Sequence, residues 1–375
     1  MGAHPTPFQR LILPGFAFKA VVIGGGYATG RELAEFFLPS GPVGGLLGMA
    51  LAMVIWSGVC ALTFMFARMT GSYNYRIFFQ NLLGPFWFIF EFAYVLVLVL
   101  ILSVFGAAAG EIGRALFQWQ TLTGTCLFMA AVASVVTFGN EAVERVFKYV
   151  TVFLYVVYAV FLGLSLWKFG DRISGGLSVP VNGLSWMSGG VAYASYNVVG
   201  AAVILPALRH VQSQRDAAIA GLLCGPLTML PAMAFFICMA AFYPAIGAQA
   251  LPSDFLLGQL GLPVFRLIFQ FMIFAALLES GSGAIHAINQ RLETVVESTG
   301  AVFQKWMRTL VALALLTVSI FIASRFGLVA LIGRGYRIIA VAFMFIYLLP
   351  LATYGMWKLI SGSRQGHRSQ SHRQT

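Results

Sequence analysis

The chain has 375 residues, of which 59% are hydrophobic and only 9% charged, and its mean hydropathy is +0.87. This composition excludes an ordinary soluble globular domain and indicates a multi-span membrane protein, because stretches of the roughly 20 apolar residues that cross a bilayer recur along the sequence. The formal net charge of +11 does not indicate a nucleic-acid partner, since the basic residues fall mostly in short loops on one side of the lipid bilayer.

Ten apolar stretches predict ten transmembrane helices within a single membrane domain over residues 1–375. In chain order they cover residues 11–38, 43–67, 86–110, 121–138, 146–167, 188–208, 217–242, 263–289, 306–323 and 337–359. We expect the first stretch to be retained rather than cleaved as a secretory signal, because Arg31, Glu32 and Glu35 follow its glycine run where a small-residue cleavage site would lie.

The distribution of basic residues predicts the orientation of these spans. If the N-terminus lies in the cytoplasm, the cytoplasmic segments, including a basic tail over residues 361–375, receive more Lys and Arg than the outer segments do. We therefore expect both termini in the cytoplasm and the protein in the inner membrane of a bacterial cell. The four cysteines lie within apolar stretches at no metal-ligand spacing and are interpreted as packing residues.

The order of the spans indicates two related halves. The long outer connection at residues 169–187 divides the chain into residues 11–168 and 188–360, with five spans each. Because five is odd, the second half enters the membrane from the opposite side, as an inverted-topology repeat requires. Gly-Tyr-Ala-Thr at residues 26–29 resembles Ala-Tyr-Ala-Ser at residues 192–195, and each segment lies in the first span of its half. We expect an all-α protein with a 5+5 inverted repeat in which helices one and six are broken.

A glycine-rich segment interrupts the first stretch where an apolar helix least tolerates it. Each glycine costs about 1 kcal/mol relative to alanine inside a helix, so three in succession exceed what close helix packing needs. Non-helical backbone survives at mid-membrane only when it is buried in protein or lines a cavity. An unwound segment would offer N–H groups to a substrate carboxylate and carbonyl groups to a cation. The candidate substrate-binding residues here are Gly24, Gly25, Gly26, Tyr27, Ala28 and Thr29.

The sixth stretch also carries polar residues where a lipid-facing helix would carry Leu or Val. Tyr193, Ser195, Tyr196 and Asn197 are candidates to complete the pocket opposite the first break, with the aromatic rings as thin gates. The alternative is that these side chains hydrogen-bond to neighbouring helices.

The eighth stretch carries an ionisable group near mid-membrane, which indicates an ion path or a specific partner. Glu279, Ser282, His286 and Gln290 share one helical face. Glu279 could bind sodium or carry a proton, and the alternative is a structural pair with Lys19 of the first stretch. His286 could relay protons, or it could be a hydrogen-bonded packing residue.

A second charged group lies toward the outer side. Glu32 and Glu35 of the first stretch, together with Arg334 and Arg337 before the tenth, could form an external gate of charge pairs. The simpler alternative is that both arginines extend to the membrane interface.

The motif Gly24-Gly25-Gly26-Tyr27-Ala28-Thr29-Gly30-Arg31-Glu32, the pair Tyr196-Asn197 and the Glu279-containing eighth span resemble the YkvI-like amino-acid permeases. These belong to the amino acid-polyamine-organocation superfamily and have the leucine-transporter (LeuT) fold. The resemblance implies import of a small zwitterion driven by sodium or protons, and it does not name the solute. It also implies that the eighth span faces the first, with a sodium site formed by Glu279, Ser280 or Ser282 and the carbonyl groups around Gly24.

The leading hypothesis is therefore an ion-coupled secondary transporter of an amino acid or related small solute, with no cofactor beyond the coupling ion. The alternative is a membrane-embedded nutrient sensor that binds a solute without carrying it. We expect no enzymatic activity, because the sequence has neither a His-Glu-x-x-His nor a Gly-x-Ser-x-Gly motif. The oligomeric state stays open.

Overall fold

The computed structural model describes residues 5–23, 25–138, 141–181, 183–298, 300 and 302–361. Every regular element within these ranges is helical. Gly24 and the predicted tail beyond Ser361 lie outside them. The longest helices are α4 (Gly41–Thr70), α6 (Trp87–Phe117), α8 (Glu141–Leu177), α11 (Gln214–Ala240), α13 (Pro263–Ser298) and α14 (Lys305–Ala330).

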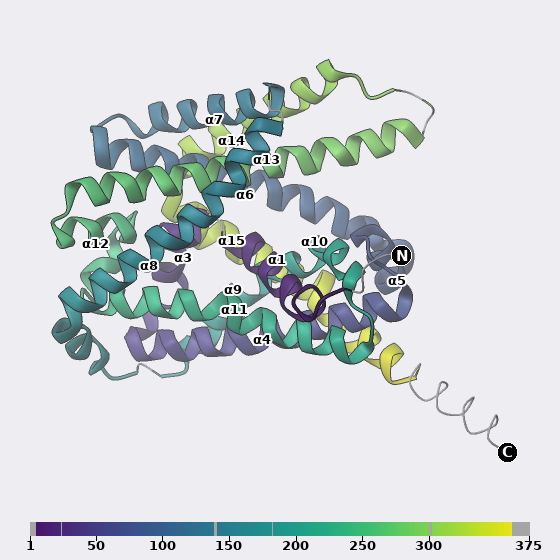
Figure 1. Ribbon diagram of the computed structural model, residues 1–375, viewed down its shortest axis with the longest axis horizontal. Coiled ribbons are helices and arrows are strands. Elements are labelled where there is room, and N and C mark those ends of the chain that lie inside the picture. Colours follow the sequence, from purple (N-terminus) through teal and green to yellow (C-terminus); the bar gives the residue numbers. More distant parts are fainter. Residues whose placement is uncertain are drawn as a thin grey trace.

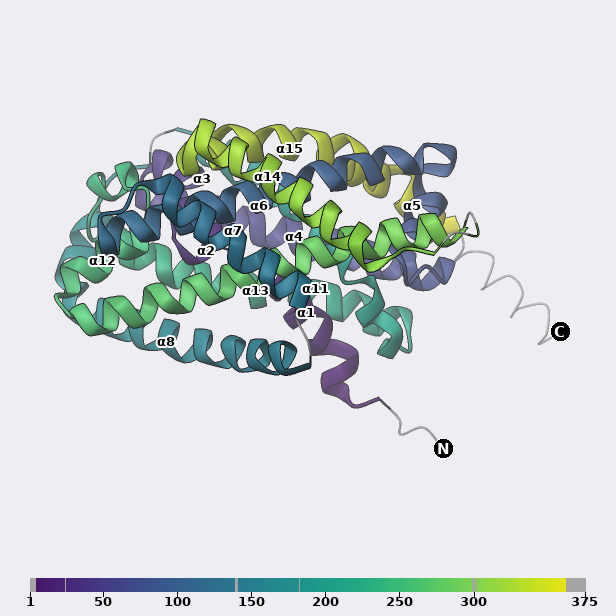
Figure 2. The same cartoon turned by 90° about the horizontal axis from the view of Figure 1, so that it is seen from above.

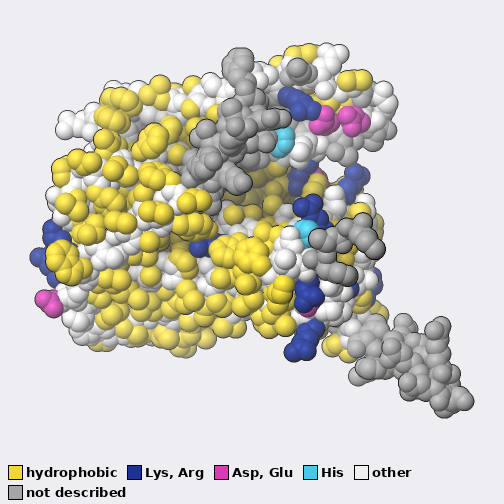
Figure 3. All heavy atoms as spheres, viewed as in Figure 1, with side chains coloured by type: hydrophobic (Ala, Val, Ile, Leu, Met, Phe, Trp, Pro, Cys, Tyr) yellow, Lys and Arg dark blue, Asp and Glu magenta, His cyan; other side chains and the backbone are white. Residues whose placement is uncertain are grey.

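The described residues contain six segments that are long and apolar enough to cross a membrane. They are Arg31–Thr70, Tyr75–Phe117, Val152–Leu177, Gln214–Ala240, Pro263–Glu297 and Trp306–Ser361. The first, sixth and tenth of the predicted spans are divided into shorter helical pieces. Figure 3 shows hydrophobic side chains over most of the visible face, with charged side chains gathered toward its two ends. This pattern is that of a multi-pass membrane protein.

Shorter elements complete the fold and include η5 and α12 in the connection between the seventh and eighth predicted spans. The α-helices are α1 (Leu13–Val22), α2 (Gly25–Ala28), α3 (Arg31–Phe36), α5 (Tyr75–Leu83), α7 (Thr121–Phe138), α9 (Ser185–Asn197), α10 (Val199–Val203), α12 (Pro252–Leu260) and α15 (Tyr336–Phe343). The 3-10 and π segments are η1 (Phe8–Ile12), η2 (Leu38–Ser40), η3 (Gly84–Phe86), η4 (Leu205–His210), η5 (Ala245–Ala248), η6 (Leu331–Gly335), η7 (Met344–Leu348) and η8 (Leu351–Gly355).

Two groups of helices enclose the short pieces. Figure 1 shows α4 and α11 side by side along one edge and α7, α13 and α14 along the other, while α1, α3, α9 and α15 lie between them. Figure 2 shows that α8 covers one face of this arrangement and α15 lies at the opposite face. Glycines allow α4 and α11 to approach closely, since a Cβ atom on Gly221 would lie 2.3 Å from the backbone of Ala61.

The first helix is broken on both sides of a single helical turn. The α1 helix ends at Val22, and Ile23 leaves helical geometry with φ −76° and ψ 75°. The α2 turn follows, and Gly30 adopts φ +77° before α3 begins. A side chain at Gly30 would be strained in this left-handed conformation, and its Cβ atom would lie 2.8 Å from the ring of Phe235. The predicted interruption is therefore present, although Gly25 and Gly26 lie in the α2 turn.

The sixth helix differs from the first because its backbone is not unwound. Val198, between α9 and α10, keeps helical angles (φ −59°, ψ −22°), and only the hydrogen-bond pattern tightens, with the Ala201 N–H donating to the Val198 carbonyl at 2.9 Å. The glycines of this stretch lie earlier, inside α9. A Cβ atom on Gly189 would lie 2.0 Å from the Phe36 carbonyl oxygen, and one on Gly190 would lie 2.5 Å from the Gly48 carbonyl oxygen. These glycines serve close packing of α9 against its neighbours.

Candidate functional site

A buried carboxyl group faces a tyrosine next to the break in the first helix. Glu32 lies in the first turn of α3 and is 5% exposed. The hydroxyl of Tyr196, in the last turn of α9, donates a hydrogen bond to Glu32 Oε2 at 2.6 Å. The ring of Tyr336 from α15 stacks on Tyr196 with centroids 4.5 Å apart. Three separate elements therefore meet at one acidic group.

A pocket of about 70 Å³ adjoins this contact. Its polar members are Glu32, Tyr196, Asn197 and Tyr336, and apolar side chains of α1, α6, α10 and α15 complete it, including Val97, Ile101 and Phe105. The pocket has room for a few water molecules. A solute of amino-acid size would need these walls to move apart.

Three buried tyrosine hydroxyls come from the elements around the break. Tyr27 of α2, Tyr158 of α8 and Tyr193 of α9 are buried, and none of their hydroxyls makes a hydrogen bond of good geometry. Tyr27 and Tyr158 line the same narrow space, and the ring of Tyr193 packs edge-on against Tyr196, which contacts Glu32. A buried hydroxyl without a partner costs about 1–3 kcal/mol. These groups are therefore suited to binding a polar ligand.

The other predicted substrate-binding residues make local contacts. Ser195 Oγ donates to the Val191 carbonyl of its own helix at 2.7 Å, and the Asn197 amide donates to the Tyr193 carbonyl at 3.1 Å. The carbonyl oxygen of Thr29 accepts a hydrogen bond from the Ser253 N–H at 2.9 Å, so the start of α12 lies against the break. Ala28 lines a narrow apolar space on the side facing α8.

The described ion pairs do not join Lys19 to Glu279, the structural alternative for these two predicted residues. Lys19 is buried, and its Nζ lies 4.3 Å from the centre of the Tyr155 ring. Glu279 is partly buried, as is Ser280. Ser282 Oγ donates to the Leu278 carbonyl of its own helix at 2.8 Å.

His286 and Gln290 continue the polar face of α13. Both are exposed, and His286 Nε2 lies 3.0 Å from Gln290 Nε2 in a hydrogen bond. Within the described residues no group of three or more His, Cys, Asp or Glu side chains is arranged to hold a metal ion.

The predicted gate residues contact other partners. Glu35 pairs with Arg31 at 2.7 Å, and Arg337 places its guanidinium 5.4 Å from the centre of the Phe36 ring. Arg334 lies in η6, where the backbone of Gly333 is so close to Glu35 that an added Cβ atom would lie 2.8 Å from Oε1. The ion pairs described in the structure do not join either glutamate to Arg334 or Arg337.

Arg31 is a residue whose role the sequence did not indicate. Its Nη1 donates to the carbonyl groups of Gly247 and Gln249 at 2.8 and 2.9 Å, and its Nη2 donates to Glu35. Arg31 thereby holds the connection that carries η5 and α12 against α3. Tyr158 and Tyr336 were also missed, because nothing in the sequence distinguishes them from other aromatic residues in apolar spans.

The comparison with solved structures identifies the fold. No protein-family model matches the chain, and no curated protein matches its sequence significantly. MhsT in complex with L-phenylalanine is similar, with a TM-score of 0.55 and 17% identity over 93% of this chain and 88% of that one. A mutant manganese transporter of Eremococcus coleocola has a TM-score of 0.53 and 17% identity over 92% of this chain and 78% of that one. Both neighbours are LeuT-fold transporters, not enzymes, and the chain shares the fold of these membrane transporters.

Proposed function

We propose that this chain is a secondary transporter that moves an amino acid or a related small zwitterion by alternating access, driven by sodium or protons. The observation that carries the proposal is the contact of Glu32 with Tyr196 beside the broken first helix. Both residues are buried, and the contact joins the first predicted span to the sixth.

The polar groups around the break match the two ends of a zwitterion. The Glu32 carboxyl group can accept hydrogen bonds from an ammonium group. The hydroxyls of Tyr27 and Tyr158, which line a separate narrow space beside the break, and that of Tyr193 would donate to a carboxylate once the walls between the two spaces move apart. Apolar residues of α6, including Val97 and Phe105, would contact the side chain of the solute.

Alternating access follows from the two groups of helices. In this conformation Arg31 and the Ser253 N–H hold the connection that carries η5 and α12 against the first helix, and we assign this closure to the outer side. Rocking of the group that contains α4 and α11 against the group that contains α7, α13 and α14 would release these contacts. The proposal includes ten spans in an inverted repeat, cytoplasmic termini and a bacterial inner membrane.

Glu279 is our proposed coupling group. Its carboxyl group makes no hydrogen bond or ion pair with the described residues, so a sodium ion or a proton would give it a counterpart in an apolar span. Sodium would also contact Ser282 and a carbonyl group near Gly24, with Ser280 as an alternative ligand. In this proposal the positive charge of Lys19 acts on Glu279, and His286 relays protons.

Reconstitution into proteoliposomes tests the proposal. Labelled amino acids are screened for uptake under an imposed sodium gradient, an imposed pH gradient and no gradient, with labelled Mn²⁺ as a separate arm. We expect at least one zwitterion to accumulate above its external concentration under one of the gradients. Specific binding of an amino acid without any flux would identify a sensor instead. Concentrative uptake of Mn²⁺ alone would identify a metal transporter.

A further inference from the structure

A second and larger pocket lies where α5, the start of α6, α10 and the last turns of α13 meet. Its volume of about 380 Å³ is within the range of roughly 300–1,000 Å³ that small-molecule sites occupy. In Figure 3 the visible face is hollowed at its right-hand end, where basic, acidic and histidine side chains gather. The basic residues of the sequence predict this end to be cytoplasmic.

Arg291 is the fixed basic group of this pocket. Its guanidinium lies between two tyrosine rings, 4.2 Å from the centre of Tyr75 and 3.9 Å from the centre of Tyr94. Its Nη1 is 3.3 Å from Glu91 Oε1, yet this buried nitrogen makes no hydrogen bond of good geometry. Contact with both rings restrains the guanidinium, and its other N–H groups, which donate to no acceptor among the described residues, can bind a ligand.

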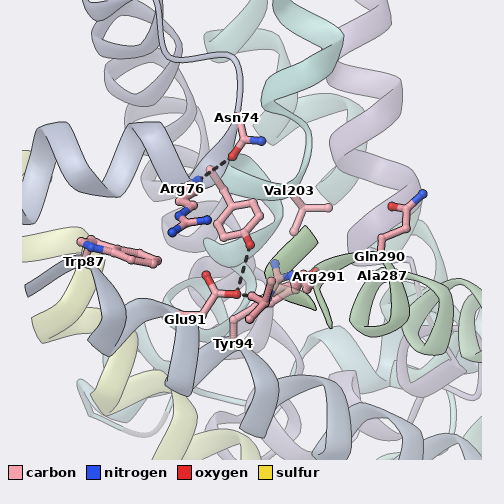
Figure 4. Close-up of a pocket in the computed structure, with 11 residues that line it drawn as sticks. Asn74, Arg76, Trp87, Glu91, Tyr94, Val203, Ala287, Gln290 and Arg291 are labelled. Atoms are coloured by element: carbon pink, nitrogen blue, oxygen red, sulfur yellow. Dashed lines mark hydrogen bonds and ion pairs between the residues drawn. The ribbon is translucent and has the colours of Figure 1, made fainter. Parts of the chain in front are cut away.

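Arg76 supplies a second guanidinium from another helix. It stacks on the ring of Trp87 at 4.7 Å, and none of the acidic side chains described in the structure lies within ion-pair distance of it. Figure 4 shows Arg76 and Trp87 across the pocket from Arg291, with Glu91 between them. The pocket therefore holds two guanidinium groups and one carboxyl group, and this excess of positive charge suits a ligand carboxylate.

Glu91 and the apolar lining complete the match to a zwitterion. The Tyr75 hydroxyl donates to Glu91 Oε1 at 3.1 Å, which orients the carboxyl group and leaves Oε2 available to accept from an ammonium group. Trp87, Tyr94 and Val203 offer aromatic and aliphatic surface in the same pocket. An apolar or aromatic amino acid thus finds a partner for each of its three parts.

We propose that this pocket is a second solute-binding site, in which an apolar or aromatic zwitterion docks its carboxylate on Arg76 and Arg291 and its ammonium group on Glu91. The proposal rests on the transport function, and it adds a stage at the predicted cytoplasmic end at which the solute is held before release. One chain would then bind two solute molecules.

A purely structural role for the charged groups must be distinguished from this one. Arg291 and Glu91 join α13 to α6, so removing either charge would also weaken that contact. Arg76 takes no part in the pair, so Arg76→Gln changes the ligand site while leaving the connection between the helices intact. Arg209→Gln is the matched control, because Arg209 is a basic residue near the same end that does not line the pocket.

The test is equilibrium binding of labelled L-phenylalanine to the full chain in lipid nanodiscs, with monodispersity and melting temperature measured for each variant. We expect two molecules to bind per chain in wild type, Arg209→Gln and Tyr196→Phe. In Tyr196→Phe, affinity should fall only at the site beside Glu32. We expect Arg76→Gln to bind at its second site about tenfold to a hundredfold more weakly, as expected for loss of a hydrogen bond to a charged group. Arg76→Lys should restore part of this affinity.

Analogues check the assigned orientation. 3-Phenylpropionate should compete at the second site in wild type but not in Arg76→Gln, whereas phenethylamine and inorganic phosphate should compete in neither. Binding of one L-phenylalanine or none per wild-type chain would overturn the second site. Binding of two molecules with unchanged affinities in Arg76→Gln would also overturn it. Failure of all concentrative uptake alongside Arg76-dependent binding would reject transport and leave the second site standing.

Discussion

The hydroxyl of Tyr196 lies 2.6 Å from the carboxyl oxygen of Glu32, which links the end of α9 to the start of α3. Both side chains are buried, and Phe36 and Tyr336 pack against the tyrosine ring. Hydrogen bonds of this length to a carboxylate are among the strong ones. The contact orients the Glu32 carboxyl group beside the pocket of about 70 Å³, where its other oxygen atom would accept a hydrogen bond from a solute ammonium group.

Tyr196→Phe tests the tyrosine hydroxyl while keeping the stacked ring. A hydrogen bond to a charged group contributes about 1.5–3 kcal/mol, so we expect the solute to bind about tenfold to a hundredfold more weakly if Tyr196 orients Glu32. Affinity is measured by equilibrium binding of the solute that the uptake screen identifies. Tyr354→Phe is the control, because Tyr354 is 41% exposed. Wild-type affinity in Tyr196→Phe would show that this hydroxyl has no part in binding.

Glu279→Gln tests coupling. The amide keeps the shape of the side chain, but it neither takes up and releases a proton nor carries the negative charge that attracts sodium. We expect gradient-driven accumulation in proteoliposomes to disappear, while exchange of internal for external solute continues. Glu297→Gln, which changes an exposed carboxyl group on the same helix, should accumulate solute normally. Concentrative uptake by Glu279→Gln at the wild-type level would remove this residue from the coupling mechanism.

Gly30→Ala tests the break in the first helix. Alanine at φ +77° costs about 1–2 kcal/mol from backbone strain alone, and its Cβ atom would also meet the Phe235 ring. We expect a lower melting temperature in detergent together with weaker solute binding. Gly58→Ala is the control, since no atom lies within 4 Å of a Cβ atom built there, and alanine favours a helix. Equal melting temperatures for the two variants would contradict the described backbone.

Arg31→Gln tests the outer closure. This change removes the hydrogen-bond donors to Gly247 and Gln249 and the ion pair with Glu35. We therefore expect the connection that carries η5 and α12 to leave the first helix more often. Alkylation of a cysteine placed at Gln249 should become faster, and solute should protect it less. Arg114→Gln is the control, because the Arg114 side chain is 60% exposed. An unchanged alkylation rate would mean that Arg31 does not hold the closure.

The break in the first helix could be predicted because its cause is local. A run of glycines is costly in a helix whatever surrounds it, and the structure interrupts the helix at Ile23 and at Gly30. For the sixth helix, the sequence could not show whether the glycines mark a break or close packing. Its glycines resemble those of a break, but Gly189 and Gly190 face the carbonyl groups of neighbouring helices. Only the tertiary structure distinguishes the two uses of glycine.

The pairing of charged side chains was the least predictable feature. The sequence suggested that Glu35 faces Arg334 or Arg337, whereas the structure pairs it with Arg31 one helical turn away. Spacing within a helix favours the local pair, and no pattern along one chain states which helices meet. For the same reason the sequence did not indicate that Arg76, Glu91 and Arg291 line one pocket.

The most direct measurement of the central claim is gradient-driven accumulation by wild type and Glu32→Gln in parallel proteoliposomes. Both preparations should first be shown to contain equal amounts of folded, uniformly sized protein. We predict that wild type concentrates at least one zwitterionic amino acid and that Glu32→Gln neither concentrates it nor binds it with comparable affinity. Accumulation by Glu32→Gln at the wild-type rate and affinity would contradict a solute site at the broken first helix.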